Sequence, residues 1–280
     1  MSDQRPGSTP PLPDTTPPPD TTPLLEASGV TVRFGGLVAL DRVGLTVPPS
    51  TIVGLIGPNG AGKSTFFGVL SGLIRPRVGT VFIDGRDVTR ASPQARARLG
   101  LARTFQRLEL FAELTVREHL VVAYRAKRRR TIFDLVRTLP IDLLGLGNRP
   151  APGENDTVDR ILELLGLTAV ASVPASSIGL GTGRLVEVAR ALAAQPRVVL
   201  LDEPSSGLDA HETEELALVL ARLRDEEGIA LVLVEHNVAM VLGLADDVTV
   251  LDFGEVIARG PAAAIRSDPA VQAAYLGTAT

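Results

Sequence analysis

A glycine-rich octapeptide is the part of this sequence whose residue types and spacing most clearly predict chemistry. Residues 57–64 read GPNGAGKS and fit the phosphate-binding pattern G-x-x-x-x-G-K-[ST]. In such a loop, backbone N–H groups turn towards phosphate oxygens, Lys63 reaches the β- and γ-phosphates, and Ser64 ligates Mg²⁺. The predicted nucleotide-binding residues are Gly57, Pro58, Asn59, Gly60, Ala61, Gly62, Lys63, Ser64 and Thr65.

The elements on either side of this loop are the ones that the chemistry requires. Residues 51–56 (TIVGLI) form a short apolar run that predicts a buried strand, and residues 64–73 predict a helix. The N-terminus of that helix adds partial positive charge beside the phosphates. A chance match within a glycine-containing loop is the alternative, and this context disfavours it.

Two acidic residues follow a second predicted buried strand. Residues 198–201 read VVLL, and Asp202 and Glu203 come directly after them. Because ligands of open α/β sheets bind at the carboxyl ends of strands, Asp202 is a candidate partner for Mg²⁺. Glu203 is a candidate general base that polarises an attacking water. Solvated acids at a strand end are the alternative.

Composition limits the class of protein. The chain has 280 residues, is 45% hydrophobic and carries a net charge of −4, which suits one large or two small globular domains and does not point to nucleic acid. The absence of cysteine excludes disulfides and cysteine metal sites. No apolar run approaches the roughly 18 residues of a membrane span. We expect a cytoplasmic chain that other subunits hold at a membrane, with a disordered Pro/Thr-rich tail over residues 1–23.

The rest of the chain predicts an α/β fold with a helical insertion. Residues 30–34 and 39–47 resemble paired strands, residues 80–83 predict another strand, and strands alternate with helices over residues 198–251. That alternation indicates a parallel sheet with crossover helices. The predicted core covers residues 24–106 and 195–280. The helical insertion covers about 107–194, with helices over residues 115–130, 157–165 and 184–194.

Three motifs together resemble a known family. GPNGAGKST at residues 57–65, LLDEP at 200–204 and SGLD at 206–209 are similar to the ATP-binding subunits of ABC transporters, and the likeness extends from about Leu24 to Gly277. The resemblance implies a P-loop NTPase core with an added antiparallel β part and an inserted helical subdomain. It also implies that ATP and Mg²⁺ bind and that ATP hydrolysis drives transport.

The resemblance suggests roles for further residues. Gln106 resembles the glutamine that touches Mg²⁺ and the attacking water, and the loop after it senses the membrane subunit in the family. Phe34 stands where an aromatic ring packs against adenine, although burial in the core is the alternative. His236 resembles the histidine that contacts the γ-phosphate. Asp209 resembles the D-loop residue that communicates between paired subunits.

One motif departs from the family. The signature Leu-Ser-Gly-Gly-Gln, which contacts the ATP of a partner subunit, aligns with residues 178–182, before a helix predicted to begin near Arg184. Of the segment Gly179, Leu180, Gly181 and Thr182, only Gly181 matches, and the serine position holds Gly179. We expect a weakened or altered composite site between two subunits.

The substrate prediction rests on finer similarities. RTFQ at residues 103–106, the segments at 110–116 and the ending DP…AYLG resemble the ATPases of branched-chain amino acid importers. The implied partners are a second ATPase subunit, identical or closely homologous, transmembrane permease subunits and, indirectly, a substrate-binding protein. The implied location is the cytoplasmic face of the membrane, as a peripheral subunit.

Several alternatives stay open at this point. ATPases of lipopolysaccharide-type exporters and of amide importers look similar in this subunit. A regulatory subunit that binds ATP without turnover would fit the altered signature, but the intact Lys63, Asp202, Glu203 and His236 argue against it. Soluble ABC proteins acting on DNA or ribosomes usually fuse two cassettes, and this chain has one. Asp252-Phe253-Gly254 is interpreted as a turn between two strands.

Overall fold

A six-stranded sheet forms the centre of the computed structural model, which describes residues 22–104, 108–128 and 150–276. The strand order is β10-β9-β3-β8-β7-β6, and all neighbours run parallel except β10, which is antiparallel to β9. The parallel sheet predicted from the sequence is therefore confirmed. Its strands are β3 (Ile52–Ile56), β6 (Leu101–Arg103), β7 (Val198–Asp202), β8 (Ala230–Val234), β9 (Asp247–Asp252) and β10 (Glu255–Gly260).

A second, four-stranded antiparallel sheet has the order β2-β1-β4-β5. The predicted pairing of the first two strands is confirmed, and their register places Leu25 opposite Val47 and Phe34 opposite Leu37. The strands of this sheet are β1 (Leu25–Phe34), β2 (Leu37–Val47), β4 (Val78–Ile83) and β5 (Arg86–Asp87).

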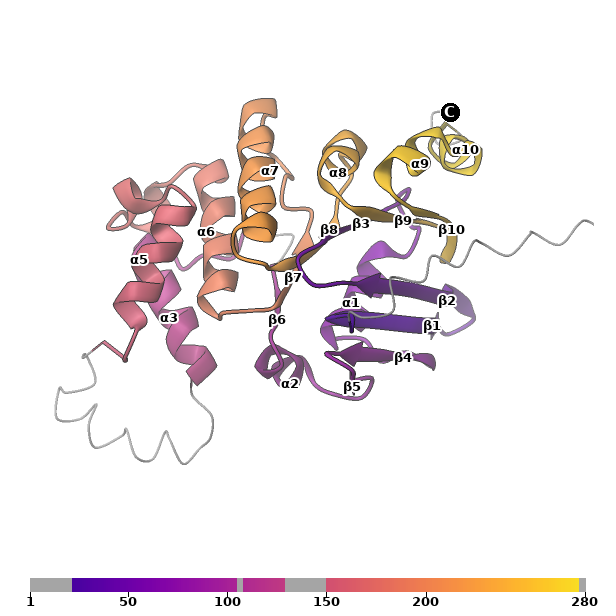
Figure 1. Cartoon of the computed structure of the whole chain (residues 1–280), viewed down its shortest axis with the longest axis horizontal. Helices are drawn as coiled ribbons and strands as arrows, with labels where there is room; N and C mark the ends of the chain where they lie inside the picture. Colours follow the sequence, from indigo (N-terminus) through magenta and orange to yellow (C-terminus); the bar gives the residue numbers. More distant parts are fainter. Residues whose placement is uncertain (1–21, 105–107, 129–149, 277–280) are drawn as a thin grey trace, which may run out of the picture.

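The helices divide into groups around the two sheets. Figure 1 shows α3, α5 and α6 gathered at one end of the molecule, with α7 and α8 over the face of the central sheet that is turned away from β1 and β2. The helices are α1 (Lys63–Ser71), α2 (Pro93–Arg98), α3 (Val116–Arg128), α5 (Glu154–Leu164), α6 (Leu180–Ala193), α7 (Ala210–Asp225), α8 (Val238–Leu244), α9 (Ala262–Ser267) and α10 (Pro269–Leu276).

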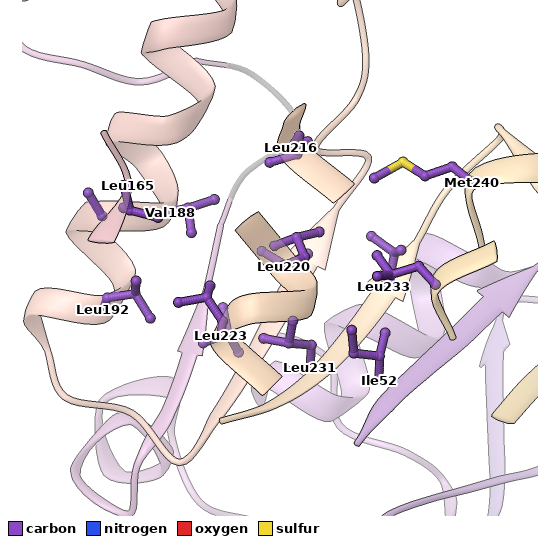
Figure 2. Close-up of a cluster of buried hydrophobic side chains, with 14 of the residues drawn as sticks. Ile52, Leu165, Val188, Leu192, Leu216, Leu220, Leu223, Leu231, Leu233 and Met240 are labelled. Carbon is purple, nitrogen blue, oxygen red and sulfur yellow. The ribbon is translucent and has the colours of Figure 1, made fainter. Parts of the chain in front are cut away.

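Alternating side chains of the central strands fill two separate hydrophobic cores. In β3, Ile52 and Ile56 join the cluster beneath α6 and α7, whereas Val53 and Leu55 join the cluster that contains α1 and the antiparallel sheet. Figure 2 shows part of the first cluster, to which α6 contributes Leu192 and α7 contributes Leu223. The central sheet is buried on both faces, so the carboxyl edge of its strands is left to build a site.

A buried arginine fixes the C-terminal end of α1. Arg96 of α2 is 1% exposed, and its Nη1 donates to the carbonyls of Val69 at 2.6 Å and Leu70 at 2.7 Å. Its Nη2 donates to Val88 O at 2.8 Å. Val69 O also accepts from Gly72 N, the C-cap residue, and Arg96 adds charged donors and a favourable positive charge beside the carbonyls of this last turn. Burial lowers the pKa of Arg96 to about 10.

Some predicted boundaries were wrong. Helix α6 begins at Leu180 and not near Arg184, so the glycines that suggested a loop lie at its N-cap, Gly179, and within its first turns, Gly181 and Gly183. Helix α5 begins at Glu154, one turn before the predicted start. Helix α2 and strand β6 were not predicted. The predicted tail lies almost entirely outside the described residues.

The division into a core and a helical subdomain stays a prediction. The described part of residues 107–194 is helical, as expected, apart from turns and a single bridge between Thr115 and Pro174. One continuous hydrophobic cluster nevertheless joins α3, α5 and α6 to α7 and the central sheet.

Replacement of Arg96 by methionine should lower the free energy of unfolding by about 3 kcal/mol, because the carbonyls of Val69, Leu70 and Val88 each lose a charged donor. Arg98, an exposed residue on the same helix, provides the matched control, and Arg98→Met should change stability by less than about 0.5 kcal/mol. Urea unfolding measures both. Equal effects of the two substitutions would contradict the structural role of Arg96.

Candidate active site

The predicted phosphate-binding loop connects β3 to α1 as expected. Gly57 follows the buried strand directly, and a Cβ at this position would lie 2.1 Å from Leu251 O of β9. No other residue fits there, so the start of the loop is fixed by a neighbouring strand. The loop then turns into α1 at Gly62, its N-cap.

Lys63 lies folded back on the loop that carries it. Its Nζ donates to Gly57 O at 2.6 Å and to Pro58 O at 2.9 Å, and the residue is only 6% exposed. Burial lowers the pKa of Lys63, while the negative charge of Glu203 acts in the opposite direction. An ammonium group held among carbonyls, at the positive end of a helix, is well placed to meet an anion.

Glu203 and His236 form a close pair at the ends of two neighbouring strands. His236 Nε2 lies 2.5 Å from Glu203 Oε1, and their side chains are 49% and 11% exposed. Glu203 has a φ of 49°, a left-handed conformation that is unfavourable for glutamate. Its N–H donates to Val234 O and its carbonyl accepts from Ser206 N, which holds this conformation in place.

Glu235, which the sequence analysis did not single out, supports both members of this pair. It is 2% exposed, and its Oε1 accepts from Ser205 N at 2.7 Å while its Oε2 accepts from His236 N at 3.1 Å. One buried carboxylate therefore bridges the segment after Glu203 and the residue before Asn237. A charged residue between a buried strand and a candidate histidine was the available signal in the sequence.

Asp202 is held by residues of β6 and of the segment after it. Arg103 Nη2 lies 2.7 Å from Asp202 Oδ2, and Thr104 Oγ1 accepts from Asp202 N at 3.3 Å. The other end of the Arg103 guanidinium donates to Ser71 Oγ at 2.9 Å, and its carbon lies 5.5 Å from the ring centre of Phe67. Sequence analysis missed Arg103, because β6 was not predicted. Gln106 lies outside the described residues.

A cavity of about 520 Å³ brings many of the predicted residues together. Its walls include the loop from Asn59 to Thr65, the pair Glu203 and His236, and Phe34. Phe34 is 53% exposed, which rules out the alternative that it belongs to the core. The volume lies within the range of roughly 300–1,000 Å³ for small-molecule sites.

The signature segment and Asp209 lie outside this cavity. Gly179 is the N-cap of α6, so Leu180, Gly181 and Thr182 form its first turn and carry the N–H groups that lack helical partners. Gly181 and Thr182 line a smaller cavity together with α7, and Asp209 caps α7 by accepting from Glu212 N at 2.8 Å.

The donors near the loop fit a magnesium ion that arrives with phosphates. Among the residues that the structure describes, no three His, Cys, Asp or Glu side chains gather where they could hold a metal. Mg²⁺ is usually bound through one or two carboxylates together with substrate phosphates. The exposed Ser64 hydroxyl in the cavity and the carboxylate of Asp202 suit that mode.

Two protein-family descriptions match this chain. The family described as "ABC transporter" matches residues 40–206, which is more than half of the chain. The chain belongs to the ABC transporter family. It is therefore an ATP-binding cassette of the ABC ATPase class, and a second family description, "Branched-chain amino acid ATP-binding cassette transporter", matches residues 255–280 of the cassette.

The curated relatives span nearly the whole cassette. The branched-chain amino acid transport ATP-binding proteins LivG of Escherichia coli K12 and BraF of Pseudomonas aeruginosa are each 38% identical over 261 residues, covering 91% of this chain and 98% of their own. The sulfate/thiosulfate import protein CysA of Mycobacterium bovis is 39% identical over 226 residues, covering 81% of this chain and 58% of its own.

The fold is also that of solved cassettes. The ADP conformation of MJ1267, an ATP-binding cassette of an ABC transporter, superposes with a TM-score of 0.77 at 29% identity, covering 92% of this chain and all of the other. A nucleotide-free cassette has a TM-score of 0.75 at 28% identity and covers 91% of this chain and 99% of its own. None of the helices within residues 22–104, 108–128 and 150–276 is long and apolar enough to cross a membrane.

Restoring the signature serine should raise ATP turnover of the cassette. Gly179 has an extended backbone with φ −70°, and a Cβ built on it meets nothing within 4 Å, so serine fits without rearrangement. One added charge-assisted hydrogen bond to phosphate is worth roughly 1.5–3 kcal/mol, so Gly179→Ser should accelerate steady-state hydrolysis about tenfold or more. Gly179→Ala adds the same Cβ without the hydroxyl and should leave the rate unchanged. Equal rates for the two variants would show that this position does not limit the site.

Proposed function

We propose that the chain hydrolyses ATP to drive a transporter that imports branched-chain amino acids or similar amino acids and amides. The match of residues 255–280 to the branched-chain family description carries this substrate assignment. The similarity to LivG and BraF over 91% of the chain supports it. Overall sequence identity alone does not identify the transported substrate, because CysA, named for sulfate and thiosulfate, is 39% identical to this chain.

Phosphate binding is assigned to the loop between β3 and α1. Residues 59–65 line the cavity, and Lys63 reaches the β- and γ-phosphates when its bonds to Gly57 O and Pro58 O give way. Bound Mg²⁺ neutralises charge that develops on these phosphates. Ser64, Asp202 and Gln106 are the residues assigned to hold it, with Arg103 fixing the orientation of Asp202.

Water activation is assigned to Glu203. Its carboxylate lies in the cavity wall, where it can accept a proton from a water that attacks the γ-phosphate. His236 orients this carboxylate through the 2.5 Å contact and, on the same cavity wall, can also donate to the γ-phosphate. The bracing of both residues by Glu235 keeps the pair in register, because a misplacement of about 1 Å is costly in catalysis.

The distribution of the motifs supports a paired assembly. The phosphate loop and the signature segment line different cavities of one chain, so Gly179–Thr182 are free to serve the nucleotide of another subunit. The N–H groups in the first turn of α6 provide a site for an anion even without the serine. Two copies of the chain, or this chain with a close homologue, would then enclose two nucleotides.

The permease contact is assigned to a groove of about 590 Å³ between α2 and β6 on one side and α3 and α6 on the other. Most of its accessible lining is apolar, with Pro93, Ala97, Ala123 and Ala191 among the contributing residues. Arg103 lines this groove and also pairs with Asp202. A subunit bound in the groove would therefore be linked to the proposed site of hydrolysis through the side chain of Arg103. Peripheral attachment to the cytoplasmic face of the membrane follows from such a contact.

Two alternatives to an amino-acid importer are distinguished by the experiments below. An exporter of the lipopolysaccharide type would use the same ATPase chemistry with a different substrate. A regulatory subunit would bind ATP with low turnover, which the altered signature permits but the close Glu203–His236 pair argues against.

Removal of the proposed general base should separate binding from hydrolysis. Glu203→Gln keeps the shape of the side chain but removes the carboxylate, so this variant should bind ATP normally and hydrolyse it at least about 100-fold more slowly, the usual contribution of a general base. The variant should also accumulate as an ATP-bound dimer in size-exclusion chromatography. Near-normal hydrolysis would remove Glu203 from its assigned role.

Transport assays in cells lacking this chain should identify the substrate. Uptake of labelled leucine, isoleucine and valine should fall and be restored by the unsubstituted chain but not by Glu203→Gln. Labelled sulfate serves as the control, and its uptake should not change. Unchanged amino-acid uptake together with altered surface lipopolysaccharide would favour the exporter instead.

A further inference from the structure

Phe253, in the turn between β9 and β10, has an energetically unfavourable exposure and backbone conformation. Its side chain is 89% exposed, more than any other large hydrophobic residue of the described chain. Its φ of 43° is in the left-handed region, which a bulky residue avoids. An exposed ring adds nothing to the core, and backbone strain of this kind gathers at ligand sites. Both costs point to a contact that forms only when something binds.

The turn that carries Phe253 is fixed against the phosphate loop. Gly254 N donates to Ala61 O at 3.0 Å, and Gly254 O accepts from Asp41 N of β2 at 2.8 Å. A Cβ on Gly254 would lie 2.7 Å from Ala39 O, so the turn cannot move closer or carry another residue there. The ring of Phe253 is therefore presented at the edge of the 520 Å³ cavity, whose walls it helps to form.

Strand order separates the two ends of this cavity. Glu203 and His236 follow β7 and β8, on one side of β3, whereas Phe253 follows β9 on the other side. The bond between Asp41 and Gly254 places β2 on the β9 side as well. Glu203 and His236, which suit phosphates, thus lie on one side of the phosphate loop. The apolar side chains of the cavity lie on the other side: Phe34, Leu37, Val38 and Phe253.

We propose that Phe253 is a second aromatic contact, besides Phe34, for the base of the bound nucleotide. This rests on the proposed ATP-binding function. A nucleotide whose phosphates occupy the loop extends its base towards the apolar end, and aromatic rings bind bases through their π-faces whatever the base. The turn that carries Phe253 is bonded to the phosphate loop, and Phe34 lines the same cavity from the end of β1.

The test compares ADP with pyrophosphate, which lacks the base. Phe253→Asn removes the ring but suits a left-handed backbone, so the variant should fold with an unchanged or higher melting temperature. In isothermal titration it should bind ADP about fivefold or more weakly, since loss of one base stack costs at least this much. Its affinity for pyrophosphate should stay the same. Phe253→Tyr keeps the ring and should retain ADP affinity.

Controls make the outcomes distinct. Leu218→Gln alters another exposed apolar residue, on α7 and away from the cavity, and should bind ADP like the unsubstituted chain. Equal ADP affinity in Phe253→Asn, or equal losses of ADP and pyrophosphate, would overturn the base contact. Unchanged ADP binding with weaker ATP-driven dimerisation would overturn it too, and would assign the ring to the second subunit. Failure of the unsubstituted chain to bind ADP or ATP would instead overturn the nucleotide site itself.

Discussion

Backbone-to-backbone contact between three segments sets the geometry on which the site depends. At Gly57, a Cβ would lie 2.1 Å from Leu251 O of β9, and at Gly254, in the turn after β9, a Cβ would lie 2.7 Å from Ala39 O of β2. Hydrogen bonds from Gly254 N to Ala61 O and from Asp41 N to Gly254 O join the same three segments. Protein interiors are close-packed and have low compressibility, so these contacts restrict movement of the phosphate loop. Its position is thus set by neighbouring segments as well as by its own residues.

Much of the fold and site followed from the sequence because each motif stands at the end of a buried strand. Parallel strands bring their carboxyl ends to one edge, so Lys63, Glu203 and His236, which line one cavity, were predictable as neighbours. Strand order was not predictable from alternation, and three contributions depend on it. Arg103 reaches Asp202 from β6, Glu235 spans two strand ends, and Phe253 enters the cavity from β9. The predicted start of α6 was wrong because its glycines suggested a loop from helix propensity, whereas the helix runs through Gly181 and Gly183.

Charge is distributed so that buried groups restrain one another before any ligand enters. Asp202 is paired with Arg103, Glu203 contacts His236, Glu235 accepts two N–H groups, and Lys63 donates to two carbonyls. Burial of unpaired charge is costly, so each of these contacts keeps an ionic side chain in a defined place. Under the proposed function, a phosphate would replace the carbonyl partners of Lys63 with a stronger anionic one.

Arg96 gives α1 a property that bears on repeated cycles of work. Its guanidinium neutralises the negative end of the helix permanently, while the positive end faces the phosphate loop. The contacts that anchor α1 at this end are therefore separate from whatever occupies its N-terminus. Under the proposed function, nucleotide would then meet a helix whose other end is already ordered. A cassette that must load and empty continually benefits from an anchor placed at the end of the helix that the nucleotide never touches.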